Sequence, residues 1–291
     1  MEKWAFYSPQ SLRELIEHLA EIHNPCFVAG GTDLMIKIRN YKIKPTTIVN
    51  LNRIHEMVYI RKEDEAIAIG AMTTFTQIAE SPIVNRYARC LGQSAGNVGS
   101  KQIRNIATIG GNIANAAPCA DSITSLMALG ARVKTINIWG EIHEKPIDDV
   151  IIGREENNLD EKEVIIEIRI PTLEGGYSAF SKIGSRTAVT ISKLNMAIVL
   201  SYNKADAAIE CPKVAFGALG PKPFISDAVA NSIKGKKFTY PVIDVIKPVL
   251  LKEVEASIAG RASFPYKREA IMGLAENTLN LLMDGIKEGG Y

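Results

Sequence analysis

The feature that most constrains this chain is a pair of Gly-Gly dipeptides far apart in the sequence, in Ala29-Gly30-Gly31-Thr32-Asp33 and Thr108-Ile109-Gly110-Gly111-Asn112. Each follows an apolar or β-branched stretch. Glycine tolerates positive φ and has no Cβ, so a ligand can approach the backbone closely. Successive backbone N–H groups in such turns form concave nests that hold anions. One Gly-Gly pair is most simply a tight turn, and two leave the turn and anion-site interpretations about equally favoured.

The residues around these dipeptides add polar groups suited to a diphosphate. The hydroxyls of Thr32 and Thr108 and the amide of Asn112 lie beside the expected nests. Small residues follow Asn112 and would let a flat ring approach. Asp121 then either caps the next helix or accepts from a ligand hydroxyl or amine, and the pattern leaves both open. The glycine spacing is not G-x-G-x-x-G, so a Rossmann dinucleotide site is not supported.

Composition excludes several classes of protein. The net charge of +2, from 34 basic and 32 acidic residues, predicts no nucleic-acid binding. The four cysteines form no CxxC pair, so a zinc or iron–sulfur site wholly within this chain is not expected. No window of 18 uncharged apolar residues and no leader pattern is found, and we expect a cytoplasmic protein that does not span a membrane.

Periodicity predicts an α+β protein with three parts, at residues 1–55, 56–173 and 174–291. The first part is expected to be a small α/β unit. The second should contain strands, a helix over 83–91, and Met127 and Trp139 in its core. In the third, three antiparallel strands precede three helices. The individual strands are expected at residues 26–29, 47–51, 59–60, 66–69, 132–139, 164–171, 177–182, 195–201 and 213–217, and the leading amphipathic helix at 12–20.

The segments from Ala29 to Leu34, from Gln102 to Ile113, and Ala120-Asp121-Ser122, in this order, resemble the flavin-binding subunits of molybdenum hydroxylases. That family includes xanthine dehydrogenase, aerobic carbon monoxide dehydrogenase, nicotinate dehydrogenase and 4-hydroxybenzoyl-CoA reductase. The resemblance covers nearly the whole chain and is greatest to the FAD subunits of bacterial xanthine dehydrogenases. The chain lacks the Cys-bearing insertion of 4-hydroxybenzoyl-CoA reductase subunits.

The resemblance implies a two-part FAD-binding domain of the vanillyl-alcohol-oxidase (PCMH) type, followed by a C-terminal domain like that of carbon monoxide dehydrogenase flavoproteins. One loop would wrap the diphosphate, and the second glycine segment would form the opposing wall. Ala114 would lie near the isoalloxazine ring, Asp121 would hydrogen-bond the cofactor, Ile165 would be an apolar contact, and Lys182 would lie near the flavin. The expected FAD-binding residues are Phe27, Val28, Ala29, Gly30, Gly31, Thr32, Asp33, Leu34, Thr108, Gly110, Gly111, Asn112, Ala114, Asp121, Ile165 and Lys182.

Two positions qualify this carry-over. From the residues alone, Lys182 is equally well an exposed strand lysine. Eight residues after it, where the family often has Asp, this chain has Thr190.

The resemblance also implies a function. A partner subunit would oxidise xanthine or another purine at a molybdenum cofactor, and electrons would pass through iron–sulfur clusters to FAD on this chain and then to NAD. The partners would be a large molybdenum-binding subunit and a small iron–sulfur subunit, in a heterotrimer or a dimer of heterotrimers. No catalytic acid–base residue is expected here. The alternatives are the flavin subunit of a nicotinate or carbon monoxide dehydrogenase, a partner-independent flavin reductase or oxidase, and a scaffold whose flavin site has decayed.

Overall fold

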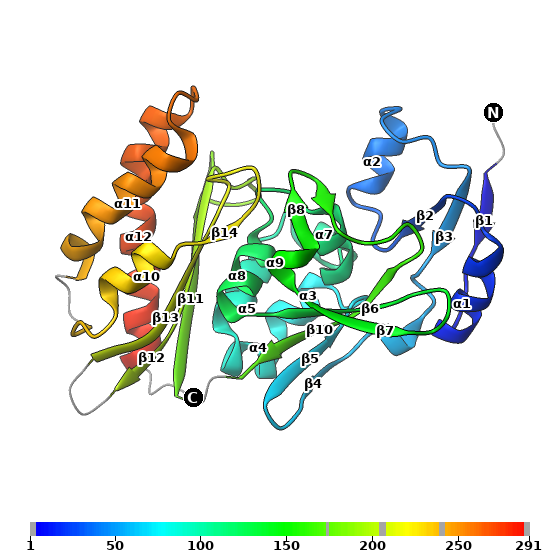
Figure 1. The fold of residues 1–291 in the computed structure, drawn as a ribbon, viewed down its shortest axis with the longest axis horizontal. Helices are drawn as coiled ribbons and strands as arrows, with labels where there is room; N and C mark the ends of the chain where they lie inside the picture. The colour runs from blue at the N-terminus through cyan, green and yellow to red at the C-terminus, as the bar shows by residue number, and fades with distance from the viewer. Residues whose placement is uncertain (1–3, 173–174, 204–207, 239–241, 288–291) are drawn as a thin grey trace.

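The fold is built on three main β-sheets that follow one another along the chain (Figure 1). The computed structural model describes residues 4–172, 175–203, 208–238 and 242–287. The sheets have the strand orders β1-β3-β2, β4-β5-β10-β6-β7 and β11-β12-β13-β14, and β8 pairs with β9. The strands are β1 Ala5–Tyr7, β2 Pro25–Val28, β3 Thr47–Asn50, β4 Ile60–Lys62, β5 Ala66–Gly70, β6 Arg132–Ile136, β7 Ile142–Pro146, β8 Ile151–Gly153, β9 Glu156–Asn157, β10 Val164–Pro171, β11 Gly176–Ile183, β12 Leu194–Asn203, β13 Ala208–Gly217 and β14 Phe224–Ile225.

The helices connect and cover these sheets. They are α1 Leu12–Glu21, α2 Leu34–Arg39, the 3-10 turn η1 His55–Met57, α3 Phe75–Glu80, α4 Pro82–Tyr87, α5 Arg89–Gly96, α6 Lys101–Arg104, α7 Ile109–Asn115, α8 Asp121–Leu129, α9 Ile147–Val150, α10 Asp227–Ile233, α11 Val242–Ile258 and α12 Phe264–Lys287. Among the described residues, no helix combines the length and the apolar character needed to cross a bilayer.

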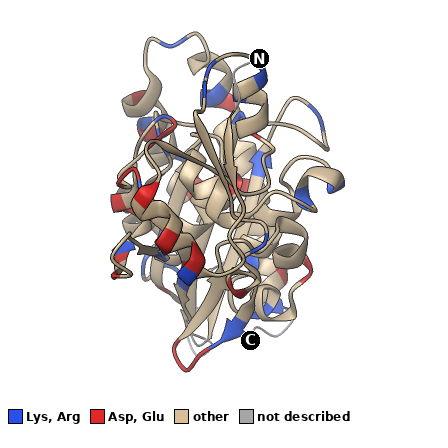
Figure 2. Ribbon diagram, turned by 90° about the vertical axis from the view of Figure 1, so that its right-hand side faces the viewer, with Lys and Arg blue, Asp and Glu red and all other residues tan. Residues whose placement is uncertain are grey.

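The first sheet is parallel and small. β3 lies between β1 and β2 and pairs in parallel with both. The predicted leading helix is confirmed as α1, since the Ser11 hydroxyl accepts from the Glu14 amide at 3.1 Å and Leu15 and Leu19 are buried. β1 was not predicted, because its three residues are exposed and show no alternation. Basic and acidic residues both occur at this end of the molecule (Figure 2).

The second sheet is centred on β10, which pairs antiparallel with β5 and β6. The predicted single helix over 83–91 is wrong: Ala88, with φ −145°, leaves the helical region and separates α4 from α5. The expected core position of Trp139 is also wrong, because it lies in the turn between β6 and β7 and is 75% exposed. Met127 is buried as expected.

The third sheet confirms the three predicted antiparallel strands and adds the two-residue strand β14. Its side chains alternate between two hydrophobic cores, as neighbouring residues of a strand point to opposite faces. Phe180, Ala197 and Val199 pack with α5 and α8, whereas Met196 and Ile198 pack with the C-terminal helices. The sheet therefore lies between two helical layers (Figure 1), and its inner face joins the rest of the protein.

An ion-pair cluster on the second sheet surrounds Glu167, whose side chain is 5% exposed. Its carboxylate accepts from the Tyr59 hydroxyl at 2.6 Å and pairs with Lys134 at 2.6 Å and Arg61 at 3.2 Å. Burial by itself raises the pKa of Glu167. The hydrogen bonds from Lys134 and Tyr59, with the charges of Lys134 and Arg61, outweigh burial and lower that pKa below its usual value.

We predict that Glu167→Gln lowers the free energy of unfolding at pH 7 by about 2 kcal/mol, because charge-assisted hydrogen bonds to a buried carboxylate are lost. A carboxyl group whose pKa is lowered by folding stabilises the protein above its unfolded pKa of about 4.3, and this contribution is lost as the pH falls through the folded pKa. Urea unfolding at several pH values should therefore show the difference shrinking below about pH 4. Glu17→Gln, at a carboxylate that is 62% exposed, is the control and should change little. A constant difference down to pH 2 would contradict this prediction.

Candidate functional site

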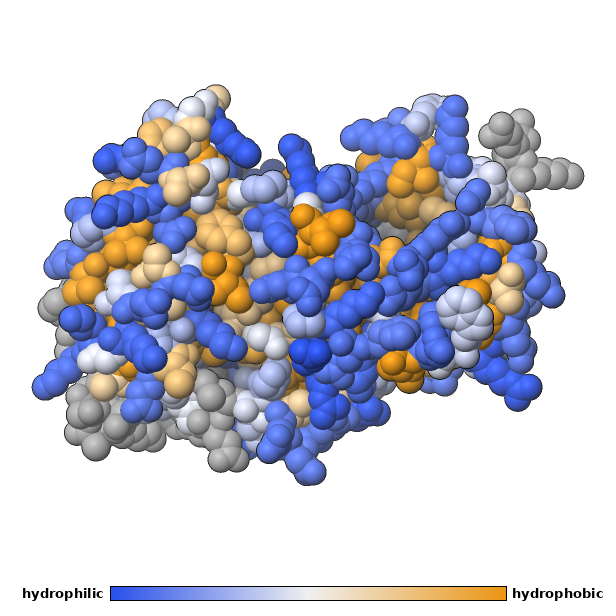
Figure 3. Space-filling model, viewed as in Figure 1, coloured by the Kyte–Doolittle hydropathy of each residue, from blue (hydrophilic) through white to orange (hydrophobic). Residues whose placement is uncertain are grey.

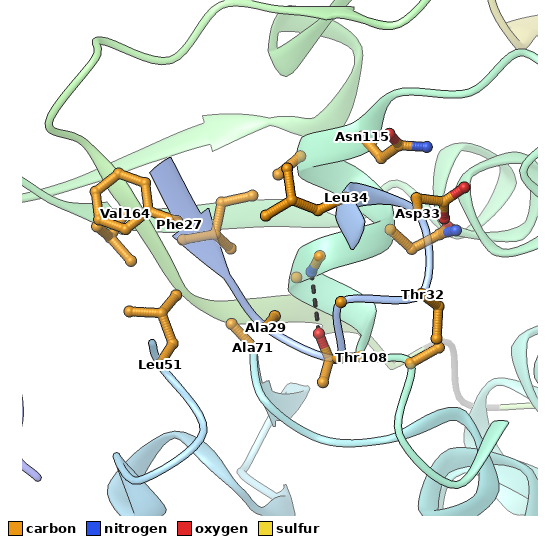
Figure 4. A pocket seen from close by; sticks show the side chains of 18 of the residues that line it. Phe27, Ala29, Thr32, Asp33, Leu34, Leu51, Ala71, Thr108, Asn115 and Val164 are labelled. Atoms are coloured by element: carbon orange, nitrogen blue, oxygen red, sulfur yellow. Dashed lines mark hydrogen bonds between the residues drawn. The ribbon is translucent and has the colours of Figure 1, made fainter. Parts of the chain in front are cut away.

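The two glycine segments lie against each other. A Cβ added at Gly30 would overlap the Ile106 carbonyl oxygen and lie 2.9 Å from Ala107 Cα, and one added at Gly111 would lie 3.3 Å from Ala29 Cβ. Between the segments opens a cavity of about 600 Å³, a size usual for small-molecule and cofactor sites. The surface is hollowed beside α2 (Figure 3), and Figure 4 shows the cavity from close by. Segments almost 80 residues apart thus share one cavity.

The first glycine segment is a loop with free amides. It leaves β2 at Val28 and turns into α2, with Gly31 at φ +69°, a conformation that favours glycine. The carbonyls of Gly31 and Asp33 accept from the amides of α2. Within the described part of the chain, the N–H groups of residues 30–34 have no acceptor. Such a row of unpaired donors in a concave loop is suited to an anion with many oxygens.

The second segment differs from the predicted nest. Thr108 is the N-cap of α7, and its hydroxyl accepts from the Gly111 amide at 3.2 Å. The Gly110 and Ile109 amides donate to the carbonyls of Ala71 at 2.9 Å and Thr73 at 3.1 Å. The expectation of a second nest is wrong, because these donors are already satisfied by the cap and by the loop after β5.

The two glycines of the second segment have different surroundings. A Cβ at Gly110 would lie 2.7 Å from Ala71 Cβ and 2.8 Å from its carbonyl oxygen, so glycine there lets α7 contact the adjoining backbone. A Cβ at Gly111 would meet the Thr108 hydroxyl at 3.0 Å. Gly111 lines the same cavity as residues 30–34.

The remaining walls carry mostly apolar side chains, together with the polar or charged residues Lys37, Asn115, Glu155, Asn157, Asp160, Glu161 and Glu163. Phe27 and Val164 lie side by side at one end of the view in Figure 4, and Asp33 and Asn115 lie at the other. Of the expected FAD-binding residues, those that line the cavity are Phe27, Ala29, Gly30, Gly31, Thr32, Asp33, Leu34, Thr108, Gly110, Gly111, Asn112, Ala114 and Ile165. Val28 does not line the cavity, because neighbouring side chains of a strand point to opposite faces. Its carbonyl accepts from the Leu51 amide. Their contacts with a cofactor stay predictions.

Sequence reasoning missed several lining residues. Lys37, on α2, donates to Asn115 Oδ1 at 2.8 Å and pairs with Glu155 at 3.0 Å. The hydrogen bond and charge of Lys37 lower the pKa of Glu155. The position of Lys37 four residues after Asp33, on a short helix, was an available signal; no pattern pointed to Glu155. The apolar residues Leu51, Ala71, Met72, Phe75, Val98, Ile103 and Val164 also line the cavity.

Asp121 and Lys182 lie outside this cavity, in a buried pair. Lys182 Nζ is 2.7 Å from Asp121 Oδ2, with exposed side-chain fractions of 9% and 6%. The helix-cap interpretation of Asp121 is wrong, since α8 begins at Asp121 and its N-cap is Ala120. The alternative of an exposed strand lysine is wrong for Lys182. Burial raises the pKa of Asp121 although the Lys182 charge and the hydrogen-bond donors around it act in the opposite direction.

The loop between the glycine wall and this pair carries Cys119. Burial raises the pKa of its thiol, and the charges of Asp121 and Asp33 act in the same direction. Cys119 therefore lies within electrostatic range of both the cavity loop and the Asp121–Lys182 pair. Among the residues that the structure describes, no three His, Cys, Asp or Glu side chains are grouped so as to hold a metal ion.

These features were compared with known proteins. The sequence family described as the FAD binding domain in molybdopterin dehydrogenase matches residues 2–173, and the one described as the CO dehydrogenase flavoprotein C-terminal domain matches residues 179–281. The chain is 30% identical to the nicotinate dehydrogenase FAD-subunit of Eubacterium barkeri, over 100% of this chain and 99% of the relative. It is 26% identical to the putative xanthine dehydrogenase FAD-binding subunit XdhB of Escherichia coli, over 95% and 94%.

The structural comparison agrees. A chain of the carbon monoxide dehydrogenase of Hydrogenophaga pseudoflava superposes with a TM-score of 0.86 at 25% identity, covering 97% of this chain and 98% of the other. The predicted α+β fold with a C-terminal antiparallel sheet and helices is thereby confirmed. The chain belongs to the family of FAD-binding subunits of the molybdenum hydroxylases.

Proposed function

We propose that this chain passes electrons from the iron–sulfur clusters of a partner subunit through FAD to NAD, in a complex whose molybdenum subunit oxidises xanthine or another purine. The observation that carries the cofactor part is the loop over residues 30–34, whose amides have no acceptor among the described residues and which lines one cavity together with Gly111. Gly111 lies close to this loop, since a Cβ added to it would be 3.3 Å from Ala29 Cβ.

The described residues fit FAD along the length of the cavity. The free amides of residues 30–34 would bind the diphosphate. The Asp33 carboxylate, which has no hydrogen-bond partner among the described residues, would accept from a sugar hydroxyl. Phe27, Val164 and Ile165 give apolar walls on which a flat ring can pack. FAD, when bound, supplies the exchange of single electrons and of hydride, while the protein positions it and sets its electrostatic surroundings. We propose that Ala114 contacts the isoalloxazine ring and that Asp121 and Lys182 lie near this ring from outside the cavity lining.

The partners follow from the names of the relatives. These are an FAD-subunit, an FAD-binding subunit and, at 25% identity, the carbon monoxide dehydrogenase medium chain of Hydrogenophaga pseudoflava. We propose a large molybdenum-binding subunit and a small iron–sulfur subunit as partners, in a cytoplasmic heterotrimer or a dimer of heterotrimers. The exposed side chains of Met35, Ile36 and Tyr41, beside the cavity, fit burial against another subunit.

Nicotinate is the second candidate substrate. The nicotinate dehydrogenase FAD-subunit is 30% identical to this chain, against 26% for the xanthine dehydrogenase subunit. Both substrates are nitrogen heterocycles that the molybdenum subunit would select.

We predict that Gly111→Val abolishes FAD binding while the protein stays folded. The added Cβ meets only the Thr108 and Ala29 side chains, at 3.0 and 3.3 Å, and the branched side chain would fill the space opposite the free amides. FAD titration of the purified full chain, followed by flavin fluorescence and circular dichroism, measures both properties. Gly110→Val is the matched variant: its Cβ meets the Ala71 backbone, so it should lower the unfolding midpoint. Normal FAD binding by Gly111→Val would show that this wall is misplaced.

We further predict that a tag on this chain copurifies a molybdenum subunit and an iron–sulfur subunit. The yellow complex should reduce NAD with xanthine and, if the second candidate holds, with nicotinate instead. Substrate-dependent bleaching of the flavin without NAD reduction would contradict the proposed acceptor only. NAD(P)H oxidation by this chain alone, with no copurifying subunits, would favour a partner-independent reductase.

A further inference from the structure

The C-terminal sheet meets α8 in a buried polar cluster around Asp121. Asp121 and Thr124 lie on α8, and Lys182 lies on β11. Ser192, just before β12, and Asn195, on β12, complete the cluster. Asp121, Thr124, Ser192 and Asn195 are all buried. A polar cluster this deep is stable only when its hydrogen bonds are made.

The hydrogen bonds of the cluster converge on one carboxylate. Asp121 Oδ1 accepts from Ser192 Oγ at 2.5 Å and from Asn195 Nδ2 at 2.9 Å, and Oδ2 accepts from Lys182 Nζ at 2.7 Å. Thr124 Oγ1 donates to Asn195 Oδ1 at 2.8 Å, which fixes the orientation of the amide. Each partner donates, so these hydrogen bonds favour the ionised form of Asp121 and oppose the effect of burial, which raises its pKa.

Glycine at position 217 of β13 makes room for this arrangement. A Cβ there would overlap both Asn195 Oδ1 and Thr124 Oγ1. Three neighbouring strands of the sheet therefore contribute to the cluster: β11 through Lys182, β12 through Asn195 and β13 through Gly217.

Hydrogen bonds from the cluster and from Ser122, the residue after Asp121, connect it to two segments that line the cavity. Lys182 Nζ donates to the Asn97 carbonyl at 2.7 Å, and the next residue, Val98, lines the cavity. Ser122, next to Asp121, donates through Oγ to Asn112 Oδ1 at 2.6 Å, and Asn112 lines the cavity. A displacement of Asp121 or Lys182 would move both walls.

We propose that Ser192 and Asn195 are positioning residues of the flavin site, which hold the Asp121 carboxylate against Lys182 and thereby fix the Val98 and Asn112 walls and neutralise the Lys182 ammonium. This inference rests on the proposed function. The C-terminal sheet would thereby help to build the site, although none of its described residues lines the cavity.

Loss of one donor has two consequences. The pKa of Asp121 rises because its ionised form loses a hydrogen-bond donor. Its pairing with Lys182 therefore weakens, and the Val98 and Asn112 walls are held less firmly. The Lys182 ammonium is then less neutralised, and positive charge near a flavin favours its electron-rich reduced form. A defect that only loosened the fold would weaken FAD binding without making the midpoint potential of the flavin more positive.

The experiment compares Ser192→Ala with Ser178→Ala in the purified full chain. Ser178, on β11, is equally buried and accepts from the Cys90 amide at 3.0 Å, so it bridges the same two layers outside the Asp121 cluster. For Ser192→Ala we expect FAD to bind about tenfold more weakly, which corresponds to about 1.4 kcal/mol, and the midpoint potential of bound FAD to become more positive. For Ser178→Ala we expect both quantities to stay at the wild-type values while the unfolding temperature falls.

The outcomes separate the two proposals. If the wild-type chain binds no FAD, the proposed function fails. If it binds FAD and Ser192→Ala matches it in both affinity and potential, the positioning role alone fails. It also fails if Ser178→Ala changes both quantities as much as Ser192→Ala does. Should Ser192→Ala not fold, Thr124→Val removes the support of Asn195 with a side chain of the same shape, and the same expectations apply to it.

Discussion

The backbone contact between Gly30 and the Ile106–Ala107 segment is the constraint on which the site depends. No side chain fits between these two stretches, so the loop after β2 is held directly against the segment that leads into α7. The amides of this loop have no acceptor among the described residues, whereas the facing segment uses its own amides for the Thr108 cap and for the carbonyls of Ala71 and Thr73. The result is an asymmetric cavity, with donors on one wall and a smooth glycine surface on the other.

Much of this architecture could be predicted from the sequence. The strands at 66–70, 164–171, 176–183, 194–203 and 208–217 carry clear alternation or long apolar runs, and α1 carries its cap in Ser11. No local pattern marks the break at Ala88. Trp139, by contrast, lies beside Gly140, whose φ is +77°, and the Asn137 side chain accepts from its amide, so a local turn signal was present. β1 is too short to show a period. It becomes a strand because it pairs in parallel with β3, and its own three exposed residues do not predict this.

The candidate site divides in the same way. The glycine segments stood out because backbone geometry restricts the residues allowed there. The state of their amides could not be predicted, since that depends on the carbonyls of the loop after β5. Lys182 was identified only through resemblance, and the residues alone left Asp121 open between a helix cap and a ligand contact. The structure gives the physical reason for treating the two together. A buried carboxylate with an ammonium, a hydroxyl and an amide around it is costly unless every bond is made, and its partners come from segments that the sequence separates by more than 60 residues.

The inner face of the C-terminal sheet limits how this chain can be divided. Its strand β11 lies at the edge of the sheet, and the Phe180 amide donates to Gln93 Oε1 of α5 at 2.7 Å. Phe180, Ala197, Val199 and Ala215 are covered by the helices of the preceding part. A fragment beginning after residue 173 would expose both an apolar surface and an open strand edge, which are the two features that promote self-association. Two sequence families divide the chain near that point, but truncation there should give an aggregating product. In a chimera of two relatives, both sides of the contact between the halves should come from the same protein.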